Sequence, residues 1–321
     1  MAAKQNTAPA VALELTDKQK KRKVRIKLIK QNYQLYFFLI PAVVFIALFM
    51  YGPLYGLVIA FKNYRPAEGI WGSRWVGFDW FIRFFSTPRC WDIVRNTLTV
   101  SIYSLIAGFP FPICLAIILN YVKNLRFKKF AQTVTYMPYF ISTVVVAGMV
   151  LSFIDKGGMI TRFLTLFGLP DQNWREQASA FPAIYTVTNV WKGFGFGSIL
   201  YISAITSIDQ SQYESARIDG ANRGQQCWYI TLPSIKNIIA INLIMAIGGI
   251  LGTNSDLILL LYTPATYDVA DVIGTYTYRL GIQGGQYSYT AAAGLFMSAI
   301  GFTLTYIANK VSNRMTGYGL W

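Results

Sequence analysis

Histidine is absent from this chain of 321 residues, and cysteine occurs only three times. The cysteines, Cys90, Cys114 and Cys227, are scattered without the short spacing of a metal or redox motif. The sequence contains no G-x-x-x-x-G-K-[ST] phosphate-binding loop and no Gly-Lys pair at all. No constellation of acids, bases or nucleophiles stands out either. We therefore expect no catalytic residue, no metal and no cofactor in this chain, and no ATP hydrolysis by such a loop.

Charged residues are also scarce. They make up 13% of the chain, against about 25% in soluble domains, while hydrophobic residues make up 54%. This balance predicts an integral membrane protein. The formal net charge of +15 would suggest a nucleic-acid binder in a soluble protein. Here the positive residues concentrate at the ends of apolar segments, so a topological role is expected and a nucleic-acid partner is not.

Six stretches are long and apolar enough to cross a bilayer, which takes about 20 residues for each helix. Prolines within them, such as Pro41, Pro110 and Pro138, favour kinked helices, which a bundle tolerates because neighbouring helices satisfy the freed backbone groups. We predict an all-α membrane protein with six transmembrane helices. The predicted spans are 35–61, 97–121, 130–154, 181–208, 238–262 and 287–309.

The distribution of Lys and Arg predicts the orientation. With a cytoplasmic N-terminus, the inside segments carry 18 Lys and Arg in 83 residues, and the outside loops carry 10 in 85. Because positive residues favour the cytoplasmic side, both termini are expected in the cytoplasm. The chain then consists of a basic extension (1–34), a transmembrane domain (35–309) and a cytoplasmic tail (310–321). The basic run Lys18–Lys30 is either an interfacial helix on anionic membrane lipid or simply an anchor for the first span.

The predicted cytoplasmic loop 209–237 contains a polar island, YESARIDGANRGQQCWYITLP. We predict two short helices with a break between them. Ser211 would cap the first helix, Gly220 would end it through its freedom in φ, and Pro233 would stop the second helix before the fifth span. The island has too few apolar residues to bury itself. It is therefore expected to lie on the membrane surface or in a groove of a partner.

The spacing E-x-A-x-x-D-G-A-x(8)-I-x-L-P in this island resembles the EAA loop of the membrane subunits of bacterial binding-protein-dependent ABC importers. In that family the loop contains a coupling helix that sits in a cleft of the cytoplasmic ATPase. Two residues depart from the pattern: Ser215 replaces an alanine, and Cys227 stands where an aromatic residue is common. The resemblance implies a type I ABC importer permease fold. It assigns ATPase coupling to Glu214, Ala216, Asp219, Gly220 and Ala221.

Three further segments, Val190–Ile205, Tyr267–Phe296 and Gly319–Trp321, resemble the carbohydrate branch of that family, particularly its polysaccharide and oligosaccharide permeases. Within that branch, the sequence is similar to permeases that import alginate oligosaccharides. The resemblance implies a location in the bacterial inner membrane. The implied partners are a second, related permease subunit, two ATPase subunits that bind ATP and Mg, an extracytoplasmic solute-binding protein and an oligosaccharide.

Polar side chains inside the spans are candidates for the substrate path, because such residues are costly in lipid and usually face a cavity or another subunit. Amide donors and aromatic faces suit a sugar, and a uronate would additionally favour Lys192. Alternatively, Lys192 extends to the outer interface or pairs with Asp256. The candidates are Asn189, Trp191 and Lys192 in the fourth span and Asn242, Asn254 and Asp256 in the fifth.

The run GFGFG, Gly193–Gly197, follows no strand and lies within the fourth predicted span. Its small residues therefore favour close helix packing rather than a phosphate cradle.

Other transport classes fit less well. A secondary transporter of a small polar solute would be expected to carry several ionisable residues at mid-membrane and a repeat between its halves, and neither is evident. A channel would need a filter-like loop, which is also not evident. An ABC permease for a non-sugar substrate stays open, because only the flanking segments favour sugars.

Overall fold

The computed structural model describes residues 30–320 and divides the chain into two units, Met1–Val58 and Ile59–Trp321. The predicted interfacial helix lies outside the described residues, apart from Lys30. The predicted first span is helical throughout. Its successive segments are α2 (Tyr33–Ile46), the π-helical η1 (Ala47–Tyr51) and the 3-10 helix η2 (Gly52–Phe61), which crosses the boundary between the units.

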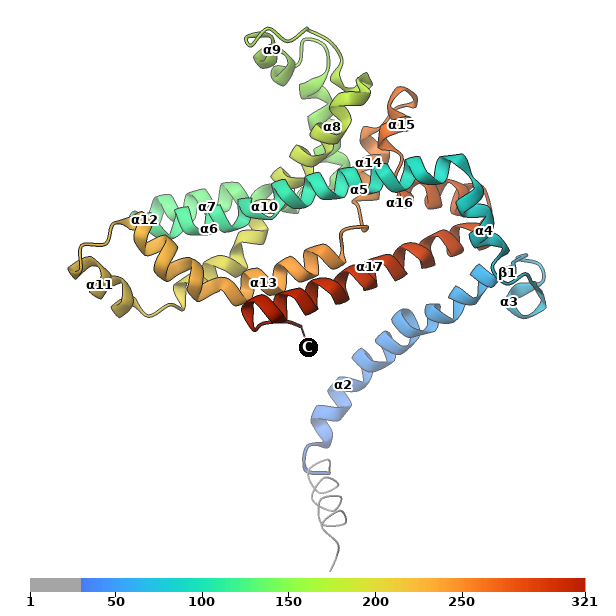
Figure 1. The fold of residues 1–321 in the computed structure, drawn as a ribbon, viewed down its shortest axis with the longest axis horizontal. Helices are drawn as coiled ribbons and strands as arrows, with labels where there is room; N and C mark the ends of the chain where they lie inside the picture. The colour runs from blue at the N-terminus through green and yellow to red at the C-terminus, as the bar shows by residue number, and fades with distance from the viewer. Residues whose placement is uncertain (1–29, 321) are drawn as a thin grey trace, which may run out of the picture. The chain divides into compact units, whose positions relative to one another are not determined.

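The second unit consists mainly of helices (Figure 1). Two short strands, β1 (Lys62–Asn63) and β2 (Arg74–Trp75), pair antiparallel near its start. Its longer helices are α5 (Pro88–Gly108), α6 (Pro110–Tyr121), α7 (Leu125–Phe140), α8 (Thr143–Ile154), α10 (Phe181–Thr206), α13 (Leu232–Gly248) and α17 (Tyr287–Thr316). The shorter helices are α3 (Gly69–Gly72), α4 (Asp79–Ser86), α9 (Met159–Thr165), η3 (Trp174–Glu176), η4 (Ala178–Ala180), α11 (Gln210–Ile218), α12 (Arg223–Gln226), η5 (Cys227–Thr231), α14 (Ser255–Leu261), η6 (Pro264–Thr266), α15 (Tyr267–Ala270), α16 (Ile273–Thr277) and η7 (Tyr278–Gln283).

Within residues 30–320, five helices are long and apolar enough to cross a membrane. The predicted fourth span coincides with α10, which has 26 residues but is not among the five. Its Asn189, Lys192 and three interior glycines lower its hydropathy. A total of six crossings therefore stays a prediction. The five helices are Tyr33–Phe61, Pro88–Tyr121, Thr143–Thr165, Arg223–Gly248 and Tyr287–Arg314.

The predicted third span, 130–154, was expected to be one helix kinked near Pro138, but it consists of two separate helices. The helix ends at Phe140, two residues after Pro138, and a new helix begins at Thr143. The side chain of Ser142 accepts a hydrogen bond from the backbone N–H of Val145 at 3.3 Å and so caps the new helix. Ser142 therefore starts a second helix inside a run of apolar residues. A hydropathy profile alone does not show this break.

The prediction of an unbroken fifth span, 238–262, was wrong. The helix α13 ends at Gly248, and α14 starts only at Ser255, with a non-helical segment between them. Gly249 and Gly252 weaken the helix there. The side chain of Asn254 accepts from the backbone N–H of Leu257 at 3.2 Å, which fixes the start of α14.

The helix α17 continues seven residues past the predicted end of the sixth span at Asn309 and stops at Thr316. Gly317, with φ +74°, ends it. The tail then turns back, because the buried amide oxygen of Asn309 accepts the backbone N–H of Leu320 at 2.7 Å. Part of the predicted tail is thus helix.

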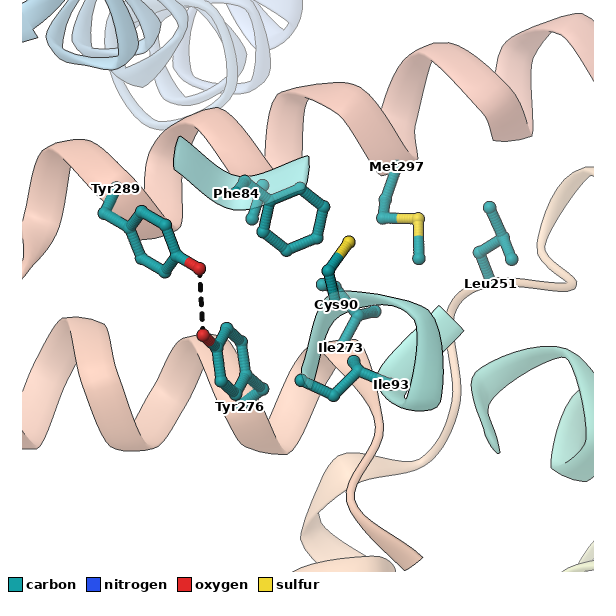
Figure 2. Close-up of a cluster of buried hydrophobic side chains, with 9 residues drawn as sticks. Phe84, Cys90, Ile93, Leu251, Ile273, Tyr276, Tyr289 and Met297 are labelled. Carbon is teal, nitrogen blue, oxygen red and sulfur yellow. Dashed lines mark hydrogen bonds between the residues drawn. The ribbon is translucent and has the colours of Figure 1, made fainter. Parts of the chain in front are cut away.

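The long helices pack around α10, which contacts α5, α6 and α7, while α13 runs beside α17 (Figure 1). A buried cluster joins α4, α5, α16 and α17 (Figure 2). In it the hydroxyls of Tyr276 and Tyr289 lie 2.9 Å apart, and Phe84 and Cys90 pack beside them. This cluster holds the ends of α5 and α17 together at the end of the unit opposite α11 and α12.

The helix α10 crosses α7 at Gly195, where a Cβ atom would overlap the backbone carbonyl of Thr135. At Gly193, two residues earlier, a Cβ atom would meet nothing within 4 Å. The predicted role of GFGFG in close packing is therefore confirmed at Gly195 and not at Gly193.

We expect Gly195→Ala to destabilise the protein by about 1–3 kcal/mol, because a backbone carbonyl yields little to an added methyl group. Gly193→Ala is the matched control and should leave stability unchanged or raise it slightly, because alanine favours a helix more than glycine does. Thermal unfolding of the purified protein in detergent checks both variants. Equal unfolding midpoints for the two would contradict the packing argument.

Candidate functional site

The polar island forms two short helices, α11 and α12, as predicted. Ser211 does not cap the first helix, because it already lies within it. The cap is Asp209, whose carboxylate accepts the backbone N–H of Ser211 at 3.0 Å. Hydrogen bonds from the backbone and the side chain of Ser211 hold the pKa of Asp209 below its ordinary value. Ionised Asp209 therefore stabilises the start of α11 fully at pH values above the pKa that its carboxyl has in the unfolded chain. This stabilisation is lost as the pH falls through the lower pKa of the same carboxyl in the folded protein.

Gly220 ends α11 in the left-handed conformation, with φ +80°. The backbone N–H of Gly220 donates to the carbonyl of Arg217 at 3.1 Å, and that of Ala221 donates to the carbonyl of Ala216 at 2.8 Å. These two bonds form a Schellman motif, which satisfies carbonyls at the end of the helix. The predicted helix end at Gly220 is confirmed.

The second half of the island runs into the membrane helix without a stop. Asn222 and Gln225 form a capping box at the start of α12, and the π turn η5 leads directly into α13. Pro233 lies in the first turn of α13 and does not end the preceding helix, contrary to the prediction. A π turn relaxes the regular hydrogen-bond ladder just where proline provides no N–H.

The five predicted coupling residues lie on or next to α11. The carboxylates of Glu214 and Asp219 are exposed, and neither forms an ion pair within residues 30–320. Ala216 and Ala221 are half-buried, and Gly220 faces open space. The loop therefore offers two uncompensated negative charges beside a surface with small side chains. This arrangement suits a partner that approaches closely and carries positive groups.

A cavity of about 450 Å³ lies between α5, α6, α10 and α13. The break in the predicted fifth span provides one wall, through Gly249, Gly252 and Thr253. Non-helical backbone at membrane depth is tolerated where it lines such a cavity or is buried in protein. None of the residues that line the cavity is charged.

Within residues 30–320, three buried hydroxyls of the cavity lining have no hydrogen-bond partner: those of Ser101 and Ser104 on α5 and of Thr253 in the break. Buried polar groups normally find partners. These hydroxyls are therefore available to a polar molecule that enters the cavity. The hydroxyl of Tyr185, in contrast, accepts the backbone N–H of Asn254 at 2.9 Å and fixes the break against α10.

Half of the predicted substrate-path residues line this cavity: Asn189, Asn242 and Asn254. Of these, Asn242 donates to the carbonyl of Ile238 at 2.9 Å. The oxygen of Asn254 caps α14. The side chain of Asn189 forms no hydrogen bond within the described part of the chain, so it is available to a ligand.

The other three candidates lie outside the cavity lining. Lys192 donates from Nζ to the hydroxyl of Thr143 at 2.7 Å, at the start of α8. Trp191 lines a separate apolar pocket between α8, α9 and α10. Asp256 is exposed in the first turn of α14, and the described chain contains no ion pair between it and Lys192.

The hydroxyls of Ser101, Ser104 and Thr253 were not predicted from the sequence. Serine and threonine are ordinary in membrane helices, so composition alone does not single out the two serines. The cluster Gly252-Thr253-Asn254 was a recognisable loop signal inside the predicted span.

This combination, a membrane helix bundle with a polar cavity and a capped surface helix between α10 and α13, is that of a transport permease. The profile of the family described as "Binding-protein-dependent transport system inner membrane component" matches residues 112–317. The chain belongs to this family.

Similar proteins are known from Bacillus subtilis (strain 168). The polygalacturonan/rhamnogalacturonan transport system permease protein YteP is 39% identical over 316 residues, which cover 98% of each chain. The protein LplB is 37% identical over 300 residues, which cover 91% of this chain and 92% of LplB. The relatives named as permease proteins are transport subunits and not enzymes.

The fold is also found in solved structures. A chain in the crystal structure of a bacterial ABC transporter involved in the import of the acidic polysaccharide alginate matches with a TM-score of 0.82 and 42% identity, covering 90% of this chain and 98% of that chain. A chain of the bacterial alginate ABC transporter in complex with alginate pentasaccharide-bound periplasmic protein gives a TM-score of 0.83 at 41% identity, covering 92% of this chain and 99% of that chain.

Proposed function

We propose that this chain is the permease subunit of an ATP-driven importer of oligosaccharides in the bacterial inner membrane. It crosses the membrane six times, with both termini in the cytoplasm. A second, related permease subunit completes the path, two ATPase subunits bind ATP and Mg below it, and an extracytoplasmic solute-binding protein delivers the substrate. YteP, named for polygalacturonan/rhamnogalacturonan transport, and the transporter of the acidic polysaccharide alginate support oligosaccharides of uronic acids as the cargo.

The observation that carries this proposal is the geometry of α11. It places Glu214 and Asp219 on the surface without an ion pair to any other described residue, and it ends at Gly220 in a conformation that favours glycine. The exposed face of this helix, with its two carboxylates, suits docking to an ATPase. Differential contacts of this element in two states of the ATPase would bias the helices between inward-facing and outward-facing arrangements.

A reconstituted complex tests the proposal. The permease is purified with its co-purifying ATPase and second permease, placed in proteoliposomes and supplied with the solute-binding protein. We expect oligosaccharides of uronic acids to stimulate ATP hydrolysis and to enter the vesicles only with ATP present. Uptake by this chain alone, without an ATPase, would contradict the proposal and favour a secondary transporter.

We further propose that the cavity contacts sugar hydroxyls through neutral groups. The unpartnered hydroxyls and the amide of Asn189 suit hydroxyl recognition, and the cavity lining contains no charge to bind a carboxylate. Lys192 is held by Thr143 instead. Within this chain, recognition of the sugar would then be independent of its charge.

Two variants separate these roles. We expect Asn189→Ala to lower uptake of acidic and neutral oligosaccharides alike by about fivefold, the equivalent of one hydrogen bond of about 1 kcal/mol. Lys192→Met should retain both activities. A selective loss of acidic uptake in Lys192→Met would place Lys192 in the substrate path and contradict the neutral cavity.

A further inference from the structure

Tyr213 is the one buried residue of α11, with 4% of its surface exposed, whereas its neighbours Gln212 and Glu214 face solvent. Its hydroxyl lies 2.9 Å from the hydroxyl of Thr231, which is completely buried. Thr231 is the last residue of the π turn η5 and directly precedes α13. A single buried hydrogen bond thus connects the short surface helix to the start of a membrane helix 18 residues further along the chain.

The direction of this bond follows from its neighbours. The hydroxyl of Thr231 also donates to the carbonyl of Gln226 at 3.4 Å. Because Thr231 has one hydroxyl hydrogen, it accepts the hydrogen of Tyr213 when it makes this second bond. The side chain of Gln226, also buried, donates in turn to the carbonyl of Ala221 at 2.8 Å, directly after the Gly220 turn. The chain of bonds therefore leads from α11 back to the turn that follows it.

A second contact fixes α12 to the neighbouring membrane helix. The hydroxyl of Tyr121, the last residue of α6, donates to the carbonyl of Arg223 at 3.0 Å. The guanidinium of Arg223 lies 5.9 Å from the centre of the Tyr121 ring. The α12 part of the loop is thus attached to both α6 and α13. The helix α11 is attached to the start of α13 through the hydrogen bond between Tyr213 and Thr231.

We propose that Tyr213 and Thr231 form a brace that makes α11 and the start of α13 move as one body. This inference rests on the proposed function. Without the brace, α11 would be joined to α12 mainly through the turn 219–222, which contains Gly220 at φ +80°. An ATPase pulling on α11 would then rotate the helix about this turn, and α13 would not follow. Tyr213 is therefore a positioning residue, which acts through Thr231 on the transport helices.

The test compares conservative variants in the complete reconstituted importer, with ATPase, second permease and solute-binding protein. Tyr213→Phe keeps the ring and its packing but removes the hydroxyl, and Thr231→Val removes the other partner. We expect each variant to lower the number of oligosaccharides imported for each ATP hydrolysed by about fivefold, as the loss of one buried hydrogen bond would allow. The double variant should fall no further than Thr231→Val alone, because Tyr213→Phe removes only a bond that Thr231→Val has already removed.

The structure offers a matched control in Tyr276→Phe. Tyr276 shares a hydrogen bond of the same 2.9 Å length with Tyr289 and is also buried, in the cluster that joins α4, α5, α16 and α17 (Figure 2). Its removal should cost a similar amount of thermal stability and leave the import ratio unchanged. A change in the ratio specific to the Tyr213 and Thr231 variants therefore reports on the brace and not on general weakening.

Several outcomes would overturn the brace. These are an unchanged import ratio in Tyr213→Phe, additive losses in the double variant, or an equal loss in Tyr276→Phe. The wild-type complex separates this failure from that of the proposed function. If the wild-type complex and the Tyr213→Phe complex both show ATP-dependent import, with the same number of oligosaccharides imported for each ATP, only the proposal of the brace is wrong. If the wild-type complex shows no ATP-dependent import, the proposed function itself fails.

Discussion

Replacing Gly220 with valine is expected to lower substrate-stimulated ATP hydrolysis and uptake at least tenfold. A β-branched residue at φ +80° is strained, at a cost of roughly 1–2 kcal/mol for the left-handed conformation. Relief of this strain would unwind the Schellman motif and move Asp219 and Ala221 away from their present positions. The added side chain would also stand in open space, on the surface proposed to dock into the ATPase. Strain and obstruction thus act together at this position.

Gly168→Val provides the matched control for this prediction. Gly168 has φ +85° and also faces open space, but it lies between α9 and η3, on the predicted outer side. This variant carries the same backbone strain and should retain coupled ATP hydrolysis. Measurement of ATPase activity with and without oligosaccharide distinguishes the two. Normal stimulation in Gly220→Val, or in the bulkier Gly220→Trp, would show that α11 needs no close approach at this residue.

The second large effect is expected at Arg279, which pairs with the buried carboxylate of Asp271. The two side chains approach to 2.6 Å, and only 1% of the Asp271 side chain is exposed. Thr275 donates a further hydrogen bond to this carboxylate at 2.8 Å. Burial alone would lower the pKa of Arg279, but the hydrogen bond and charge of Asp271 raise it above its ordinary value. Arg279 therefore stays ionised, and its bond to Asp271 holds η7 to the segment before α16.

We expect Arg279→Gln to destabilise the protein by about 3 kcal/mol, because it leaves a buried carboxylate without its main partner. The cost falls at the lower end of the usual range because Arg89 stays 3.9 Å from the same carboxylate. Asp271→Asn should cost less. The two arginines left behind have about a third of their side chains exposed, so water can solvate them.

Denaturant or thermal unfolding in detergent measures this asymmetry. Arg65→Gln is the control, because Arg65 pairs with Glu68 at 3.2 Å on the surface, where both side chains are exposed. Such exposed pairs contribute about 0–1 kcal/mol. If Arg279→Gln proved no more destabilising than Arg65→Gln, burial of Asp271 would not be the source of the stability.

Much of the structure of the cytoplasmic loop 209–237 could be predicted, because helix-capping residues act on their close neighbours in the chain. The pattern around Gly220 predicted a helix end, and the structure shows a Schellman motif there, since a left-handed residue at a helix end strongly favours glycine. The prediction for Ser211 failed by two residues. Asp209 competes for the same orphan amides and is better placed, immediately before the first turn.

The cavity was only partly predictable. Asn189 and Asn242 were found because an amide inside an apolar span is conspicuous. Ser101 and Thr253 were not, since their significance depends on meeting across a space between helices. Lys192 was conspicuous as well, but its partner is Thr143, 49 residues earlier in the chain. Hydropathy gives no information about which neighbour a polar side chain meets.

Local patterns in the chain were enough to predict the membrane class, the approximate position of most helices and the two-helix form of the polar island. Each of these depends on hydropathy or capping among residues close together in the chain. Two features became visible only once the helices were packed together: which hydroxyls lack a partner within residues 30–320, and how Tyr213 reaches Thr231. These features arise from helix packing, which brings together residues that are remote in sequence and leaves no pattern in either segment alone.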